Sequence, residues 1–580
     1  MKVERGNIDP TLRAMGGRAR YQLLQVIVIN IGSFGAAYQL LDNIFIGRDV
    51  LGQRCAAPDN SSDIPAGLQD LDWNSSDVNY DKCQMTVSRS NHSGGAKEYP
   101  CLYGYTYDYH REMSFRTEFD LVCDRKLLGS LAQSLVIMGQ GTGAVLFSMV
   151  SDRFGRKRTL VMSQFALLVI GMLIGVAPNF AVFALLKFTV GGFQQGVVTT
   201  MATMSIELFP MEYRSMQPFF FSLIWGMGAC SMALFAFSMR ELGWRYLQFT
   251  LSGTSLFICL LQLWYLDESL RWLVSNGRKE SAMRVMERAA RVNRKKLGSI
   301  LHVLQGSENK DLSCEGSSGT PTSNEEEEEE GDALKSPPPT EAMLEAVEET
   351  LQKKQAERMT ILDIFRHKRL LVTAIIVWIS WFATAIAFFS LYMMSTRLHG
   401  NRFLNYFLTA LMEVPPGFLL YYLVDKSGRK PTSRLFFFLA GAGLLCSGIM
   451  RIFSGSSVLT TMSVVMAMVG MVGASGLIGA VFFFTPELFP TNIRNQALGI
   501  SSFAGRLGGM LAPFMTNLAE VAIWAPGAII GSLCFLVIFL FRIIPETKGR
   551  ELPHTIEDIK KWHRQIHEAE EQSDSVTTKC

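Results

Sequence analysis

Asp152-Arg153-Phe154-Gly155-Arg156-Lys157 lies between two long apolar runs, and a matching stretch, Asp425-Lys426-Ser427-Gly428-Arg429-Lys430, follows 273 residues later. An ionised side chain at the centre of a bilayer costs about 2.5 to 3.5 kcal/mol on insertion scales, so neither stretch can lie in lipid. Each is expected to form a tight turn at a membrane face. Glycine permits a backbone conformation there that a β-carbon opposes, and aspartate can cap a helix.

Two further motifs recur in the same order. Glu207-Leu208-Phe209-Pro210 with Arg214 returns as Glu487-Leu488-Phe489-Pro490 with Arg494, at an offset of 280 residues. Asp267-Glu268-Ser269 corresponds to Pro545-Glu546-Thr547, at an offset of 278 residues. Charged turns end helices in any multi-pass membrane protein, which explains one copy but not three ordered pairs. The pairs indicate a chain of two related halves.

The composition is typical of a membrane protein. Of the 580 residues, 48% are hydrophobic and 18% are charged, and the apolar residues come in blocks. A bilayer core of about 30 Å requires about 20 apolar residues per helix, and twelve blocks meet this requirement. The sequence therefore predicts an all-α membrane protein with twelve transmembrane helices in two six-helix halves. The expected spans are 21–41, 128–150, 158–178, 180–203, 216–238, 245–266, 369–394, 403–424, 434–453, 457–480, 495–516 and 522–544.

Lysine and arginine concentrate before the first expected helix, after the second and after the eighth. The positive-inside rule makes these segments cytoplasmic, so both termini are expected inside the cell. The start of the chain lacks the pattern of a cleaved secretory signal, and the first helix is expected to be an uncleaved anchor. The expected domains are a cytoplasmic N-terminus (1–20), an N-terminal half (21–266), a cytoplasmic linker (267–368), a C-terminal half (369–544) and a cytoplasmic tail (545–580).

The segment 43–127 is expected to be an extracellular loop that is tied by disulfides and glycosylated. The residues concerned are Cys55, Cys83, Cys101 and Cys123 and the glycosylation acceptors Asn60, Asn74 and Asn91. An oxidising compartment favours two disulfides among the four cysteines, and three pairings remain open. The acceptors indicate passage through the secretory pathway, and we expect a location in the plasma membrane.

The linker has a low-complexity middle with an acidic run, Glu325 to Glu330. Such a composition cannot bury enough apolar surface to offset its ordering entropy, so this part is expected to be disordered. Its flanks, 278–297 and 341–358, have helical patterning with basic or mixed faces. We expect both flanks to lie along the inner membrane surface.

Few formal charges remain inside the expected spans, and such charges are candidates for function. Lys187, Glu413 and Arg506 stand out, and Pro415-Pro416 is expected to break the helix beside Glu413. The alternative for each residue is an internal salt bridge that never meets substrate. Aromatic side chains that could bind a cation are available nearby. They are Trp225, Trp378, Trp381, Phe388 and Tyr392.

The chain resembles solute carrier family 22, the organic cation, anion and zwitterion transporters of the major facilitator superfamily. The duplicated turns and the four-cysteine loop carry this resemblance together with several short motifs. These are Leu12-Arg13-Ala14-Met15-Gly16, Asp120-Leu121-Val122-Cys123, Asp267-Glu268-Ser269-Leu270-Arg271-Trp272-Leu273 and Pro545-Glu546-Thr547-Lys548-Gly549.

The resemblance implies alternating access, in which two six-helix halves rock around a central site. It also implies that the charged turns form cytoplasmic ion-pair networks that hold the outward-facing state and break as the inside opens. The simpler alternative is that these residues only anchor helix ends. The gating candidates are Asp152, Arg153, Gly155, Arg156, Lys157, Glu207, Arg214, Asp425, Gly428, Arg429, Glu487 and Arg494.

In the resembling family, cation-selective members tend to have Asp at the position of Arg506, whereas anion and carnitine-type members have Arg. Many anion members add a Lys four residues after the acid of helix 8, where this chain has Gly417. One Glu and one Arg without that Lys indicate a zwitterion of carnitine type. A carboxylate could pair with Arg506 in bidentate fashion while Glu413 or an aromatic face takes the cation.

Several alternatives stay open. The chain could be an organic anion or organic cation transporter of the same family, or a non-transporting receptor on the same fold. Co-transported sodium or an exchanged solute are possible partners, besides membrane lipid. Motifs of Walker type, His-Glu-x-x-His and Gly-x-Ser-x-Gly are absent from the sequence, so neither an enzyme nor a cofactor or metal site is expected, and nucleic acid is not an expected partner.

Overall fold

The computed structural model describes residues 8–48, 50, 52–57, 78–87, 97–214, 216–300, 361–453, 456–490 and 493–548. The predicted glycosylation acceptors, the acidic run and the flank 341–358 lie outside these residues.

The N-terminal half contains six helical segments that could span a membrane. The first consists of three consecutive helices, α2 (Arg20–Asn30), α3 (Ser33–Leu41) and α4 (Asn43–Ile46). The other five are α6 (Lys126–Phe154), α7 (Arg156–Gly175), α8 (Phe180–Leu208), α9 (Met216–Ser238) and α10 (Trp244–Tyr265). Small residues let α6 and α8 pack backbone to backbone, since a β-carbon on Gly139 would lie 2.0 Å from the Phe188 carbonyl oxygen.

The C-terminal half repeats this arrangement. It contains α16 (Lys368–Ser395), α17 (Arg402–Leu411) with α18 (Val414–Ser427), α19 (Arg429–Ile452), α20 (Ser457–Leu488), α21 (Arg494–Val521) and α22 (Ala525–Leu540). The eighth span is interrupted at Glu413, as predicted. Pro415 and Pro416 lack backbone N–H groups, so two carbonyls of the preceding turn lose their helical partners.

Ten described helical segments are long and apolar enough to cross a membrane by length and composition. The other two expected spans are also helical: α21 has 28 residues but carries several polar side chains, and α22 is a shorter apolar helix of 16 residues. The prediction of an all-α membrane protein is confirmed.

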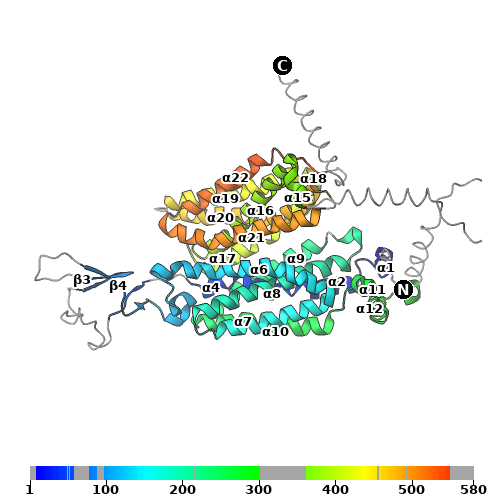
Figure 1. Ribbon diagram of the computed structural model, residues 1–580, viewed down its shortest axis with the longest axis horizontal. Helices are drawn as coiled ribbons and strands as arrows, with labels where there is room; N and C mark the ends of the chain where they lie inside the picture. The colour runs from blue at the N-terminus through cyan, green and yellow to red at the C-terminus, as the bar shows by residue number, and fades with distance from the viewer. Residues whose placement is uncertain are drawn as a thin grey trace, which may run out of the picture.

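A small β domain lies at one end of the bundle, which we call the cap end (Figure 1). Strand β1 (Arg54–Cys55) pairs antiparallel with β5 (Tyr105–Thr106), and β2 (Val78–Tyr80), β3 (Gln84–Val87) and β4 (Lys97–Pro100) form an antiparallel sheet. Short helices η2 (Arg111–Met113), α5 (Phe115–Glu118) and η3 (Cys123–Arg125) lead back to α6. Of the three open disulfide pairings, the structure contains Cys55–Cys101 and Cys83–Cys123.

Four short helices lie at the opposite end, which we call the terminal end because both described chain ends lie there (Figure 1). They are α1 (Asp9–Ala14), α11 (Leu270–Ser275), α12 (Lys279–Asn293) and α15 (Ile361–Arg366). The first three share a hydrophobic core that includes Leu12, Trp272 and Met286. This core fastens the N-terminal helix to the segment that follows α10.

The two halves contact each other at the cap end. The Asn517 amide donates to the Ser130 hydroxyl over 2.8 Å, and the Ser134 hydroxyl donates to the Met510 carbonyl over 2.6 Å. Lys126 forms an ion pair with Glu520 across the same junction between α6 and α21. These bonds close the cap end of the bundle.

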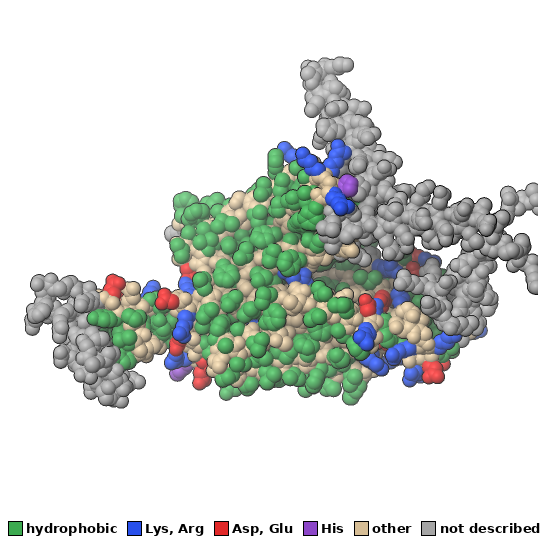
Figure 2. Space-filling model, viewed as in Figure 1, with side chains coloured by type: hydrophobic (Ala, Val, Ile, Leu, Met, Phe, Trp, Pro, Cys, Tyr) green, Lys and Arg blue, Asp and Glu red, His purple; other side chains and the backbone are tan. Residues whose placement is uncertain are grey.

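Between α6 and α21 the halves separate toward the terminal end, whereas α9 stays in contact with α18, where the rings of Phe219 and Phe418 lie 5.2 Å apart. Ile137, on the face of α6 that meets α21, is 1% exposed, whereas Val145 on the same face is 63% exposed, and Ser148 and the Asp152 side chain are exposed as well. Figure 2 shows the corresponding recess between the two halves. The structure is therefore open at the terminal end and closed at the cap end.

Candidate substrate site and turn networks

Glu413 lies at the break between α17 and α18. Its side chain is only 4% exposed, and its Oε1 atom is buried without a hydrogen-bond partner among the described residues. Its backbone carbonyl oxygen lies 3.5 Å from the Ser222 and Ser475 hydroxyls, which come from α9 and α20. A buried carboxylate without a cation is costly, so a positively charged ligand group would stabilise it.

Aromatic side chains surround this carboxylate. The Tyr392 hydroxyl and the Trp225 indole lie beside Glu413. Phe388 packs against Tyr392 with ring centroids 5.1 Å apart, and both belong to α16. Trp225 of α9 and Tyr392 of α16 are therefore brought together with Glu413, and Phe388 contacts Tyr392.

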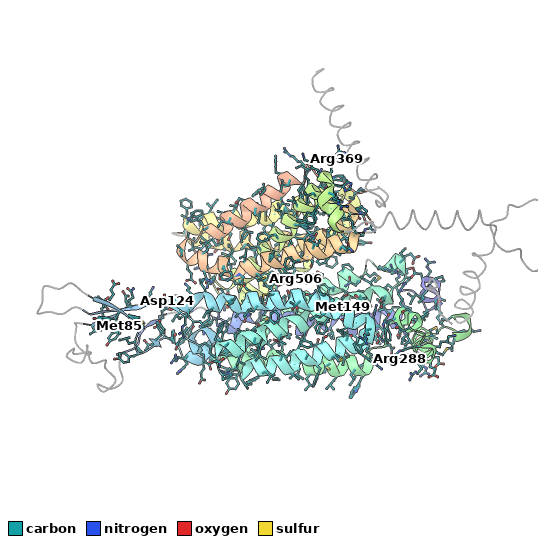
Figure 3. All side chains as sticks on the ribbon, in the orientation of Figure 1. Met85, Asp124, Met149, Arg288, Arg369 and Arg506 are labelled. Atoms are coloured by element: carbon teal, nitrogen blue, oxygen red, sulfur yellow. A yellow bond between two sulfur atoms is a disulfide. The ribbon has the colours of Figure 1, made fainter. Side chains whose placement is uncertain are left out.

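Arg506 lies on α21 where the halves begin to separate, between α21 and α6 (Figure 3). The side chain lies against Gly141 of α6, where a β-carbon would be 3.4 Å from its Cδ atom, which is ordinary van der Waals contact. Its Nη1 donates to the Ser502 hydroxyl over 2.5 Å and to the Ser502 carbonyl over 3.3 Å, while Nε is buried without a partner. Arg506 has no ion pair among the described residues.

Lys187 is already paired. Its ammonium donates to Asp42 over 2.6 Å, and the side chains of Lys187 and Asp42 are 0% and 1% exposed. The ion pair joins α8 to the junction of α3 and α4. Sequence reasoning did not identify Asp42, because it follows the expected end of the first span and resembles a solvent-facing residue there. Substrate contact by Lys187 stays a prediction, but its charge is compensated within the bundle.

Two tryptophans of α16 differ in their surroundings. The Trp381 indole donates to the Thr485 hydroxyl over 2.9 Å and its ring lies 4.6 Å from that of Phe482, so it ties α16 to α20. The Nε1 of Trp378 is buried without a hydrogen-bond partner among the described residues. Neither is brought to Glu413 by a described contact, and their role in binding stays a prediction.

The first charged turn forms a network inside the N-terminal half. The Arg156 guanidinium binds Glu207 over 3.0 to 3.3 Å and also pairs with Asp152. The Glu268 carboxylate accepts the Arg156 and Lys157 backbone N–H groups over 2.9 and 3.0 Å, and so caps the start of α7. Gly155 has φ +104°, and a β-carbon there would lie 2.5 Å from Glu268.

The second turn repeats these contacts in the C-terminal half. Arg429 binds Glu487 over 3.2 to 3.3 Å, and Glu546 accepts the Arg429 and Lys430 backbone N–H groups over 2.9 and 3.0 Å at the start of α19. Gly428 has φ +98° and faces Glu546. The motifs that recur in the sequence thus make the same hydrogen bonds and ion pairs in both halves. The sequence shows Glu268 and Glu546 as a recurring pair, but it does not predict that they cap helices.

The remaining gating candidates make fewer contacts than Arg156 and Arg429. Arg153 and Asp425 are exposed, and Arg214 lies 3.7 Å from Asp9. Two nitrogens of Arg494 are buried without a partner among the described residues. The ion pairs described for the gating candidates join elements of the same half, and they are present although the terminal end is open. Their action as a latch stays a prediction.

Comparison with known proteins defines the class. Residues 125–513 match the family model of the Major Facilitator Superfamily, and the chain belongs to this superfamily. It is therefore a membrane transporter and not an enzyme. The inward-open structure of the xylose transporter XylE from E. coli superposes with a TM-score of 0.55 at 14% identity, covering 92% of this chain and 98% of the other. At this identity the likeness confirms the fold alone.

Curated relatives match over nearly the whole chain. The organic cation transporter-like protein of Drosophila melanogaster is 27% identical, covering 96% of this chain and 92% of the relative. Organic anion transporter 3 of Sus scrofa is 28% identical, covering 94% and 92%. Solute carrier family 22 member 6 of Mus musculus is 26% identical, covering 95% and 94%. The resemblance to solute carrier family 22 is confirmed, and relatives named for cations and for anions are similar to the same degree.

Proposed function

We propose that the protein transports small organic ions by alternating access and prefers zwitterions of carnitine type. The observation that carries this proposal is the pair of uncompensated charges in the C-terminal half. Glu413 and Arg506 have opposite signs, and neither has an ion pair among the described residues. A ligand with a cationic and an anionic group would compensate both.

The two charges suit the two ends of such a ligand. The Arg506 guanidinium presents a planar fork of N–H donors that matches a carboxylate in bidentate geometry. A quaternary ammonium cannot donate a hydrogen bond, and it is bound by a carboxylate together with aromatic faces. Glu413 with Tyr392 and Trp225 offers this combination.

A second candidate is an organic anion. Arg506 is half-buried where the recess begins, whereas the Glu413 side chain is 4% exposed. A carboxylated ligand could reach the arginine without touching the glutamate. Because relatives named for anions and for cations are similar to the same degree, overall identity does not choose between these substrates.

We infer the orientation from the charge of the two ends. We place the terminal end in the cytoplasm, because its turns are rich in arginine and lysine, and the cap end with its two disulfides outside the cell. The protein would then lie in the plasma membrane and be open to the cytoplasm. Sodium or an exchanged solute could drive transport.

Uptake into cells that express the chain tests the proposal. Labelled carnitine, tetraethylammonium and an aromatic carboxylate are compared, each with and without sodium. Cells that do not express the chain give the background uptake of each compound. Carnitine uptake above that of both other compounds is expected. Uptake of the aromatic carboxylate alone would favour the anion transporter, and absence of uptake for all three would favour a receptor.

A further inference from the structure

Helix α12 is amphipathic: its apolar face is buried in the protein, and most of the cations on its polar face have no ion pair among the described residues. Val285, Met286 and Ala289 are buried in the core that α12 shares with α1 and α11. Side chains three and four residues apart line the same face of a helix. The opposite face carries Arg284, Arg288 and Arg291 at this spacing, and all three residues are exposed.

The basic face continues beyond the helix. Residues 278–296 contain eight basic and two acidic residues, and all ten are exposed. The helix ends in a left-handed residue, Arg294, with φ +54°, and the Lys295 N–H donates back to the Ala290 carbonyl over 2.9 Å. This turn keeps Lys295 and Lys296 beside the last carbonyls of α12, where cations are favoured. We call the exposed cations of 278–296 the basic patch.

Most of this charge is not compensated by the protein. Arg288 pairs with Asp267 over 2.8 Å, and Arg278 lies over the Trp272 ring at 5.2 Å. The other six cations have no ion pair among the residues that the structure describes. They are Lys279, Arg284, Arg291, Arg294, Lys295 and Lys296.

The position of the patch corresponds to a membrane surface. Trp264 and Tyr265, at the end of α10, are 72% and 49% exposed, and exposed aromatic residues at helix ends mark the level of lipid headgroups. Helices α11 and α12 follow directly after α10 and lie beyond its end (Figure 1). The Trp272 indole donates to the Asp152 carbonyl over 2.8 Å, which holds this segment against the first charged turn.

We propose that the basic patch of α12 binds a multiply phosphorylated lipid headgroup of the phosphoinositide class. Six cations without an ion pair, set against the two exposed glutamates of the same segment, still exceed what one singly charged headgroup can neutralise, and the arginine fork matches phosphate oxygens. Clusters of four to eight basic residues on an amphipathic helix beside a membrane bind such lipids. The leaflet concerned is the cytoplasmic one only if the proposed orientation holds, but the site itself does not depend on the transported substrate.

Binding to the purified full-length protein in neutral detergent tests this inference. The ligands are a short-chain phosphatidylinositol bisphosphate, a short-chain phosphatidylserine and the free inositol trisphosphate headgroup. We expect the phosphoinositide to bind at least about tenfold more tightly than phosphatidylserine. Equal affinity for phosphatidylserine would overturn the choice of lipid, and tighter binding of the free headgroup than of the lipid would overturn its source.

A matched pair of variants locates the site. Arg284→Gln, Arg291→Gln and Lys295→Gln together remove three charges from the basic patch. Arg366→Gln, Lys368→Gln and Arg369→Gln remove three charges from the terminal end of the other half. We expect at least about a tenfold loss of phosphoinositide binding in the first variant and less than about a twofold change in the second. An equal loss of phosphoinositide binding in both variants would contradict the assignment of the site to the basic patch.

Two further measurements test whether misfolding of the glutamine variant or binding of the acidic run to the patch could explain the result. Arg284→Lys with Arg291→Lys keeps the charge, so a folded protein that binds within about threefold of wild type is expected even where the glutamine variant fails to fold. The acidic run Glu325 to Glu330 could occupy the patch instead of lipid. In that case wild type would bind phosphoinositide only after these glutamates are changed to glutamine, which would overturn the proposal.

Discussion

Arg506 and Glu413 differ from the other buried charges of the bundle. Lys187 is neutralised by Asp42 at 2.6 Å, and Arg156 by Glu207 at 3.0 Å. Arg506 is held only by Ser502, which supplies hydrogen bonds but no charge. A charge retained in a membrane protein without compensation is expected to act on something that the protein alone does not contain.

Arg506→Asp is expected to reverse the charge preference of transport. The variant loses a bidentate, charge-assisted contact of about 1.5 to 3 kcal/mol, so carboxylated substrates should lose at least about tenfold in affinity, and simple cations should gain access. Competition of labelled uptake by carnitine and by tetraethylammonium measures both effects. Arg506→Lys keeps the charge and should fall between them. An unchanged order of substrates in Arg506→Asp would contradict the assigned role.

Glu413→Gln is expected to weaken the binding of quaternary ammonium groups while the aromatic contacts remain. The residual affinity then comes from Tyr392 and Trp225, whose faces contribute about 0.5 to 2 kcal/mol. Uptake kinetics of a quaternary ammonium substrate measure the change. Glu241→Gln, at the exposed ion pair with the neighbouring Arg240, removes a carboxylate outside the site and serves as the control. Equal effects of both substitutions would argue against contact with Glu413.

Gly155→Ala is expected to lower stability by about 1 to 3 kcal/mol, because φ is +104° and the new β-carbon would lie 2.5 Å from the Glu268 carboxylate. Gly499→Ala is the control, since a β-carbon there meets nothing within 4 Å and α21 gains a better helix former. Thermal melting of the purified variants in detergent compares them. A melting temperature for Gly155→Ala at or above that of the control would refute the strain.

At the scale of elements, the halves meet along two seams, α6 with α21 and α9 with α17 and α18, and the first seam changes most along its length. Helices α6 and α21 contact each other at Ser130, Ser134 and Ile137, and they separate beyond Gly141 toward the terminal end. Arg506 lies at this transition. A change from the open to the closed terminal end would therefore alter the surroundings of the arginine.

Ser130→Cys with Asn517→Cys is expected to lock the cap end, because the two side chains already lie 2.8 Å apart. Oxidation should abolish uptake in the double variant, and reduction should restore it. Each single variant under oxidation serves as the control for the native cysteines. Full uptake after complete cross-linking would show that the cap end need not open, which contradicts alternating access.

The sequence predicted most of the fold because its signals are local. Apolar blocks predict spans, Pro415-Pro416 predicts the broken helix, and the duplicated turns predict two halves. Contacts between residues far apart in the chain could not be predicted from the sequence. The disulfide Cys83–Cys123 was one of three open choices, and Asp42 lies 145 residues from Lys187, so neither spacing nor periodicity connects them.

At the scale of the molecule, the two halves carry equivalent turn networks but different intramembrane charges. The N-terminal half neutralises Lys187 internally, whereas the C-terminal half keeps Glu413 and Arg506 uncompensated. The C-terminal half is thus expected to select the substrate, while the N-terminal half carries the basic patch of α12 at the terminal end.

The most direct test of the proposed zwitterion site compares three ligands on the purified protein that differ in charge and little in shape. They are carnitine, its methyl ester, which keeps only the cation, and the analogue with carbon in place of the quaternary nitrogen, which keeps only the carboxylate. Wild type is expected to bind carnitine at least about tenfold more tightly than either analogue. Arg506→Gln should remove the preference over the ester, and Glu413→Gln the preference over the carbon analogue. Wild-type protein that binds either analogue as tightly as carnitine would contradict recognition of both charges.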